Sequence, residues 1–198
     1  MITYTLRLFD ECEKIDEIII PAEPDYFDLL EKIKIENNFS KITRIIPGGT
    51  TRQESVYNGL KSLRAEQNDL VAVHDAARPL LDKKILSNAL NTAENSDNNN
   101  AVLAVNGKDT VVLKNDSSFE YLNRENLFYV QTPQIFRYKI LMKAFEKAAE
   151  ENFTGTDESM LVSRTGERIN FVEGSYKNFK ITTSDDLALL EHIISANS

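Results

Sequence analysis

The stretch that decides the fold is Leu70-Val-Ala-Val-His-Asp-Ala-Ala-Arg-Pro-Leu80. It begins as a continuous apolar run, which is typical of a strand buried on both faces of a parallel sheet. It ends in three ionisable side chains, His74, Asp75 and Arg78, before Pro79 interrupts regular hydrogen bonding. Because ligands of open α/β sheets bind beyond the carboxyl ends of the strands, this stretch predicts a binding site at Asp75.

The chemistry of these end residues allows two interpretations. The carboxylate of Asp75 can hold a hard cation, and Mg²⁺ commonly bridges such a carboxylate and substrate phosphates. Arg78 can bind phosphate or orient the aspartate. An ion pair that merely ends a strand explains the same residues equally well, so both interpretations stay open at this point.

Strand and helix patterns alternate on both sides of this stretch. Short apolar runs predict strands at 17–20, 43–46 and 101–105. Apolar residues at helical spacing predict helices near 2–9 and at 25–37, 53–63 and 82–94. The alternation predicts an α/β fold with a doubly wound, mostly parallel sheet of the Rossmann-like kind.

The pattern changes after residue 105. The β-prone runs 110–113 and 119–122 flank a turn at 115–117 and predict a hairpin that protrudes as an arm at about 108–127. Exposed Phe119 and Tyr121 would favour a second subunit as cover, although the hairpin could also fold onto its own domain. Later patterns predict strands at 127–130, 168–172 and 178–181 and helices at 138–150, 157–163 and 185–194, with Thr156 as the cap of the helix at 157–163.

Composition narrows the class of protein. The 198 residues favour one domain, and a net charge of −8 argues against a nucleic-acid-binding surface. No apolar run approaches the roughly 20 residues of a membrane span. A single cysteine, Cys12, excludes an internal disulfide and, with two histidines, makes a structural zinc site improbable. We expect a protein of the reducing cytoplasm that binds neither membrane nor nucleic acid.

Other candidate binding residues lie where the chain turns. Gly48 and Gly49 precede a predicted helix that would present Arg52 and Ser55 to an anion or a carbonyl oxygen, although a tight turn explains the glycines as well. Lys180 lies among apolar neighbours and can neutralise a phosphate or protect a sheet edge. The remaining candidates are Arg124 and the hydroxyls of Thr110, Thr132 and Thr156.

Together these residues carry a resemblance. The order and spacing of Gly49-x-x-Arg52-x-x-Ser55, His74-Asp-Ala-Ala-Arg-Pro79, Gln131-Thr-Pro-Gln134, Thr156-Asp-Glu158 and Asn178-x-Lys180 resemble the 2-C-methyl-D-erythritol 4-phosphate cytidylyltransferase family over essentially the whole chain. The resemblance implies transfer of CMP from CTP to the polyol phosphate in non-mevalonate isoprenoid precursor synthesis, with release of pyrophosphate and Mg²⁺ as cofactor. Positioning and cations carry such chemistry more than a protein nucleophile does.

The resemblance also implies roles for single residues. Asp75 would place Mg²⁺, and Lys180, Arg124 and Asp75 would form the catalytic set. Thr110 and Arg124 would reach the sugar phosphate of a partner subunit, which makes a homodimer the expected assembly. The other substrate-binding residues implied are Gly49, Arg52, Ser55, Ala76, Arg78, Thr132 and Thr156.

The resemblance has one departure at the N-terminus and leaves two alternatives open. The family opens with a strand and a glycine-rich loop carrying an Arg and a Lys, whereas residues 1–6 resemble the helix that follows, so we expect about 25–30 family residues to be lacking. The alternatives are a ribitol-5-phosphate cytidylyltransferase, whose pattern is similar, and a non-catalytic dimeric relative that binds nucleotide.

Overall fold

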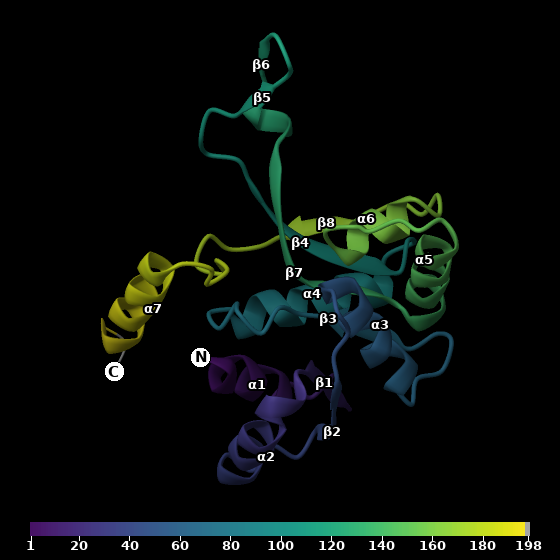
Figure 1. The fold of residues 1–198 in the computed structure, drawn as a ribbon, viewed down its shortest axis with the longest axis vertical. Coiled ribbons are helices and arrows are strands. Elements are labelled where there is room, and N and C mark those ends of the chain that lie inside the picture. Colours follow the sequence, from purple (N-terminus) through teal and green to yellow (C-terminus); the bar gives the residue numbers. More distant parts are fainter. Residues whose placement is uncertain (197–198) are drawn as a thin grey trace.

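The structure is a computed structural model that describes residues 1–196 (Figure 1). The first half of the chain alternates between α1 (Ile2–Asp10), β1 (Ile18–Ala22), α2 (Phe27–Glu36), β2 (Ile42–Pro47), α3 (Arg52–Ser62), β3 (Leu70–Val73), α4 (Lys83–Asn95) and β4 (Asn100–Asn106). The second half contains β5 (Val112–Lys114), β6 (Phe119–Tyr121), β7 (Phe128–Arg137), α5 (Tyr138–Glu150), α6 (Glu158–Ser163), β8 (Phe171–Glu173) and α7 (Ser184–Ala196). The single-turn helices are η1 (Pro24–Tyr26) and η2 (Arg124–Asn126).

The central sheet has the strand order β3-β7-β4-β8. Strand β7 is antiparallel to both β3 and β4, whereas β8 is parallel to β4. Three of the four strands therefore run in one direction, and the expected α/β class with a mostly parallel sheet is confirmed. Strand β4 is the innermost, since the side chains of Ala101, Val102 and Leu103 are fully buried.

Helices cover both faces of this sheet. On one face, α1 and α4 contribute Phe9 and Leu86 to a cluster that includes Leu103. On the other face, α3, α5 and α6 bury apolar side chains such as Leu60 and Leu141 in a second cluster. The period of these helices puts their apolar residues on the side that faces the sheet. No helix in the described part of the chain is long and apolar enough to cross a membrane.

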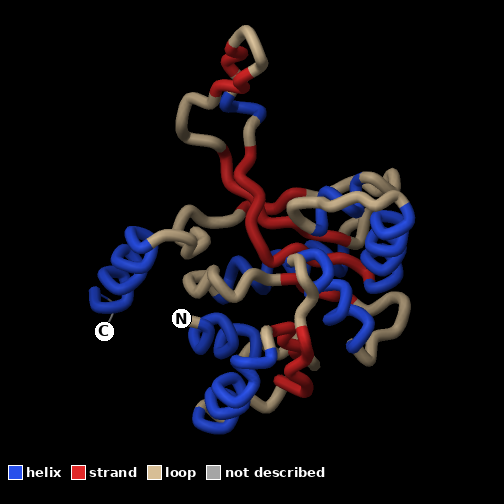
Figure 2. Tube along the Cα trace, in the orientation of Figure 1, coloured by secondary structure: helices blue, strands red, loops and turns tan. Residues whose placement is uncertain are grey.

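Strands β1 and β2 form a separate parallel pair. Among residues 1–196 no ladder of backbone hydrogen bonds joins β1 to β3, and the strands form distinct groups in Figure 2. A cavity of about 640 Å³ lies between them. All four residues of β3 are half-buried as a result, so the prediction that this strand is buried on both faces was wrong.

The predicted hairpin is present. Strands β5 and β6 pair in antiparallel register, with Val112 opposite Tyr121, and project from the body as an arm (Figure 1). All six strand residues are exposed, including Phe119 at 67% and Tyr121 at 75% of their surface. A dimerisation role for this arm stays a prediction.

Two local predictions were wrong. Residues 178–181 do not form a strand, because Ile181 makes only an isolated backbone bond, its N–H donating to the Ala77 carbonyl at 2.9 Å. The residue that caps α6 is Asp157 rather than Thr156, and its carboxylate accepts the N–H of Met160 at 2.8 Å. Lys180 therefore lies on a loop.

Candidate functional site

The centre of the site is the carboxylate of Asp75, two residues beyond the end of β3. Its Oδ1 lies 3.2 Å from Nε of Arg52, and its Oδ2 lies 3.2 Å from Nζ of Lys180 and 3.4 Å from Nε of Arg78. The three cations come from the first turn of α3, the loop after β3 and the segment before α7. A protein of net charge −8 thus gathers positive charge at one strand end, as anion binding requires.

The cations hold Asp75 in its charged form. Burial alone would raise the pKa of this carboxyl, but Arg52 and Lys180 outweigh it and hold the pKa below its ordinary value. For Arg78 the balance is reversed, because burial lowers the pKa of the guanidinium more than Asp75 raises it. The carboxylate of Asp75 is therefore ionised at neutral pH and available to a hard cation.

Arg52 is held from its other side by Glu158, the first residue of α6. Nη1 and Nη2 of Arg52 donate to Oε1 and Oε2 of Glu158 at 2.6 and 3.0 Å. Burial raises the pKa of Glu158, and the hydrogen bonds from Arg52 oppose that shift. The Glu158 side chain is only 1% exposed, so the plane of the guanidinium is fixed by a buried two-pronged pair.

The Gly48-Gly49 turn is closed by side chains of the helix that follows. Ser55 Oγ accepts the N–H of Gly49 at 2.9 Å and donates to the Thr51 carbonyl at 2.9 Å. A Cβ on Gly49 would lie 2.2 Å from Cβ and 2.9 Å from the backbone carbon of Glu54. Only glycine therefore fits at position 49, because the backbone there passes close to Glu54.

A chain of hydrogen bonds links the back of the site. Thr132 Oγ1 accepts the N–H of Asp75 at 3.0 Å and lies 3.1 Å from Nδ1 of His74. The opposite ring nitrogen, Nε2, lies 3.1 Å from the Arg78 carbonyl, which can only accept, so the network assigns the proton to Nε2. Burial lowers the pKa of His74 to about 4, which keeps the ring neutral.

The loop that carries Lys180 is anchored by Asn178, which is fully buried. Its Nδ2 donates to the Thr132 carbonyl at 2.9 Å, and its main-chain carbonyl accepts a hydrogen bond from Nη1 of Arg78 at 2.7 Å. Gln134 fixes α6 in a similar way, with Oε1 accepting the N–H of Ser159 at 2.7 Å. These two buried amides tie the Lys180 loop and α6 to strand β7.

The structure gathers some of the sequence candidates and leaves others apart. Asp75 is in contact with four of the other candidates, which are Arg52, Arg78, Lys180 and Thr132. Gly49 and Ser55 adjoin Arg52 in the chain, Ala76 follows Asp75 with its carbonyl accepting Thr5 Oγ1 at 3.1 Å, and exposed Thr156 precedes α6. Thr110 and Arg124 are exposed on the arm, which points away from the body (Figure 1).

Sequence reasoning missed Glu158, Asn178, Gln134 and His74 as organisers of the site. All four lie inside motifs that were recognised, yet nothing in the local pattern distinguishes a buried acid in a first helical turn from a solvated one. Within residues 1–196 no three His, Cys, Asp or Glu side chains gather to hold a metal. An ion at Asp75 would take its further ligands from water and substrate phosphates.

An α/β sheet with an ionised aspartate among three cations at one strand end suits a nucleotidyltransferase, an enzyme that binds phosphate groups and a metal ion together. The chain belongs to the 2-C-methyl-D-erythritol 4-phosphate cytidylyltransferase family, whose sequence profile it matches over residues 1–196. It is 40% identical over 193 residues to the enzyme of that name from Clostridium botulinum strain Langeland, covering 96% of this chain and 83% of that one. The Clostridium perfringens strain SM101 relative is also 40% identical, over 197 residues.

Solved structures agree with this assignment. The 4-diphosphocytidyl-2C-methyl-D-erythritol synthase of Anaerococcus prevotii superposes with a TM-score of 0.88 at 29% identity, covering 98% of this chain and 85% of that one. The 2-C-methyl-D-erythritol 4-phosphate cytidylyltransferase of Thermus thermophilus gives 0.77 at 29% identity, covering 97% and 87%. The resemblance read from the motifs is confirmed.

Proposed function

We propose that this chain transfers the cytidylyl group of CTP to 2-C-methyl-D-erythritol 4-phosphate and releases pyrophosphate, in the cytoplasm and as a step of isoprenoid precursor synthesis. A phosphate oxygen of the acceptor attacks the α-phosphorus of CTP, and the bond from that phosphorus to the pyrophosphate oxygen breaks. The observation that carries the proposal is the group of Arg52, Arg78 and Lys180 around Asp75. Negative charge develops in such a reaction, and positioned cations stabilise it.

The three cationic side chains around Asp75 have different roles, which follow from how many partners hold each of them. Arg52 is committed to Glu158 and Asp75, so it shapes the pocket for the nucleotide together with Gly49 and Ser55. Lys180 is 40% exposed and makes one ion pair, which leaves it free to meet a phosphate. Arg78 and Thr132 hold Asp75 in place, while Ala76 and Thr156 line the base and polyol sides.

Asp75 is the residue that would hold Mg²⁺. A single carboxylate with substrate phosphates as the remaining ligands is an ordinary way for proteins to bind this ion. The ionised state of Asp75 and its position at the strand end fit that role. When bound, Mg²⁺ would neutralise the triphosphate, and Lys180 would then move from Asp75 toward phosphate.

We propose that the protein acts as a homodimer in which residues 1–198 form one catalytic domain and residues 108–127 its arm. Thr110 precedes β5 and Arg124 follows β6, so both belong to the arm that projects from the body (Figure 1). The arm of a second subunit would supply them, and its exposed Phe119 and Tyr121 would be covered in the same contact.

The test is pyrophosphate release from CTP and Mg²⁺ with 2-C-methyl-D-erythritol 4-phosphate, run beside ribitol 5-phosphate. We expect release with the first acceptor, lowered at least about 10³-fold in Asp75→Asn and unchanged in the control Asp28→Asn, an exposed acid of α2. Release with ribitol 5-phosphate alone would assign the sister activity. CTP binding without release in either reaction would identify a non-catalytic relative.

A further inference from the structure

The first turn of α3 carries, directly after Arg52, a side chain that the proposed chemistry does not use. Nε2 of Gln53 donates to the carbonyl of Phe153 at 3.1 Å, and Oε1 of Gln53 accepts the N–H of Gly155 at 2.9 Å. Both polar atoms of one side-chain amide are thus engaged with the main chain of residues 151–157, the loop that joins α5 to α6. This pairing connects the helix after the Gly48-Gly49 turn to the loop that contains Thr156.

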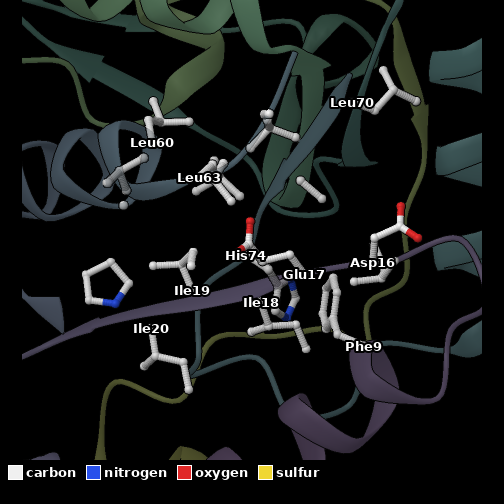
Figure 3. A pocket seen from close by; sticks show the side chains of 18 of the residues that line it. Phe9, Asp16, Glu17, Ile18, Ile19, Ile20, Leu60, Leu63, Leu70 and His74 are labelled. Carbon is white, nitrogen blue, oxygen red and sulfur yellow. The ribbon is translucent and has the colours of Figure 1, made fainter. Parts of the chain in front are cut away.

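The period of α3 explains why Gln53 points toward this loop. Leu60 and Leu63 lie on one face of the helix and point into the cavity between β1 and β3 (Figure 3). Gln53 and Tyr57 share another face, because four residues separate them. The ring of Tyr57 stacks on Phe145 of α5, with the ring centroids 5.7 Å apart. Gln53 therefore lies on the side of α3 that faces α5, and there it meets the loop that follows α5.

Two glutamine side chains hold the neighbours of Thr156. Gln53 accepts the N–H of Gly155, and Nε2 of Gln134, on β7, donates to Oδ2 of Asp157 at 3.1 Å. Gly155 and Asp157 are thus anchored, whereas Thr156 between them is exposed. Anchored neighbours limit where the threonine hydroxyl can lie, and hydrogen bonds of this kind are how a fold holds a binding group in place.

The loop also packs against apolar side chains. A Cβ on Gly155 would lie 2.7 Å from Cδ2 of Leu161, which is buried. Phe153 packs into the apolar cluster of α3, α5 and α6, and the guanidinium carbon of Arg164 lies 3.9 Å from the centre of its ring. These contacts do not involve Gln53. Loss of its amide should therefore shift the main chain at 153–155 without unfolding the loop.

One turn of α3 holds the chain on both sides of Thr156. Gln53 binds Gly155 just before it, and Arg52 binds Glu158 two residues after it. Arg52 also pairs with Asp75 at 3.2 Å. The positions of Thr156 and Asp75 are therefore both set by the same helical turn. A transfer between two bound substrates needs this kind of relation, because its rate depends steeply on how the reacting groups are oriented.

We propose that Gln53 is a positioning residue for the acceptor substrate, which it places by holding the main chain on which Thr156 lies. The inference rests on the proposed function, in which Thr156 lines the polyol side of the site. Gln53 acts through the loop, because both polar atoms of its amide are bound to main-chain groups. Its loss weakens binding of the polyol phosphate and leaves binding of CTP nearly unchanged, whereas loss of Glu158 loosens the nucleotide pocket.

The experiment compares Gln53→Leu with Gln67→Leu, the same substitution at an exposed residue before β3. Steady-state pyrophosphate release gives KM for each substrate. In Gln53→Leu we expect KM for the polyol phosphate to rise at least about tenfold and KM for CTP to change less than about twofold. Hydrogen exchange of the Gly155 amide, measured without substrates, should quicken at least about tenfold, because its acceptor is lost. Gln67→Leu should match the wild type in all three.

A double-mutant cycle with Thr156→Val separates positioning from a general loss of structure. If Gln53 acts through Thr156, adding Gln53→Leu to Thr156→Val raises KM for the polyol phosphate less than about twofold further. Should Gln53→Leu fail to fold, Gln53→Glu takes its place in the cycle, because it keeps an acceptor for Gly155 and loses the donor to Phe153.

The outcomes distinguish this inference from the proposed function on which it rests. A wild-type chain that releases no pyrophosphate with either polyol phosphate would refute the proposed function, and the inference with it. With an active wild type, three results would overturn the positioning role alone. These are equal rises of KM for both substrates, additive effects of the two substitutions in the cycle, and unchanged exchange of the Gly155 amide.

Discussion

Arg52 and Glu158 are 106 residues apart in the chain, yet they form a two-pronged pair with N–O distances of 2.6 and 3.0 Å. The pair joins the first turn of α3 to the first turn of α6 and leaves the third nitrogen of the guanidinium, Nε, for Asp75. Glu158 thus sets the orientation of Arg52, which faces Asp75. Glu158 is a positioning residue, and its loss should affect both stability and nucleotide binding.

Glu158→Gln tests this relationship. The change removes one of the two carboxylates that pair with Arg52 and leaves only Asp75, so we expect a loss of about 2–3 kcal/mol in the free energy of unfolding, below the usual range for buried pairs because Arg52 is partly exposed and keeps one partner. KM for CTP should rise more than kcat falls, since the nucleotide pocket loosens. Urea denaturation and steady-state kinetics measure the two effects.

The matched control is Glu151→Gln. Glu151 and Arg164 also form a pair at 2.6 Å, but both side chains are exposed, so solvent screens it. We expect neither stability nor kinetics to change measurably in this variant. Equal effects of the two substitutions would mean that pair distance, and not burial, governs the interaction, and the positioning role of Glu158 would fall.

The sequence predicted the order of elements well because the period of apolar residues reports directly which faces are buried. The strand and acidic end at Leu70 to Asp75 were placed correctly for that reason. Residues 178–181 were misassigned because a short apolar run forms a strand only where a sheet edge can accept it, and edges are set by distant chain. The half-burial of β3 could not be predicted for the same reason, because the segments that cover a strand come from distant parts of the chain.

The sequence predicted those site residues whose type has one common role at the end of a strand. Asp75 with Arg78 at a strand end pointed to an anion and cation site, and the structure adds Arg52 and Lys180 to the same carboxylate. Glu158 could not be found in this way, because an acid in a first helical turn is ordinarily solvated. Its burial depends on Arg52 arriving from a remote helix.

Gly49→Ala is expected to disrupt the turn before α3. The added Cβ would lie 2.2 Å from Cβ of Glu54, and backbone must move to relieve the clash. Gly48→Ala is the milder comparison, because its Cβ would approach the Ser55 hydroxyl at 3.0 Å. We expect CTP affinity, measured by calorimetry, to fall at least tenfold more in Gly49→Ala. Similar affinities in both variants would show that the turn does not shape the nucleotide pocket.

Shared active sites make a specific prediction for mixed subunits. If Arg124 serves the partner's Asp75, then Arg124→Ala and Asp75→Asn chains are each inactive alone, and a mixed dimer contains one intact site. Random mixing should restore about a quarter of the wild-type turnover per subunit, since half of the dimers are mixed. If two chains that each form dimers restore no turnover when they are mixed, Arg124 does not serve the partner's site.

The same arm contact predicts that Phe119→Asp loses the dimer in sedimentation, whereas the control Ile35→Asp, at an exposed residue of α2, keeps it.

His74 predicts how stability depends on pH. Its pKa is about 4 in the folded chain and about 6.5 in the unfolded chain, so the unfolded state takes up the proton first as pH falls. Stability is therefore complete above pH 6.5 and declines as pH drops toward 4, by about 2 kcal/mol between pH 7 and pH 5. The lowered pKa of Asp75 acts at lower pH and leaves this window clear. The side chain in His74→Asn cannot titrate, so its free energy of unfolding, measured by urea denaturation, should fall by about 2 kcal/mol less between pH 7 and pH 5. The same pH dependence of that free energy in both proteins would refute the assignment of a neutral buried ring.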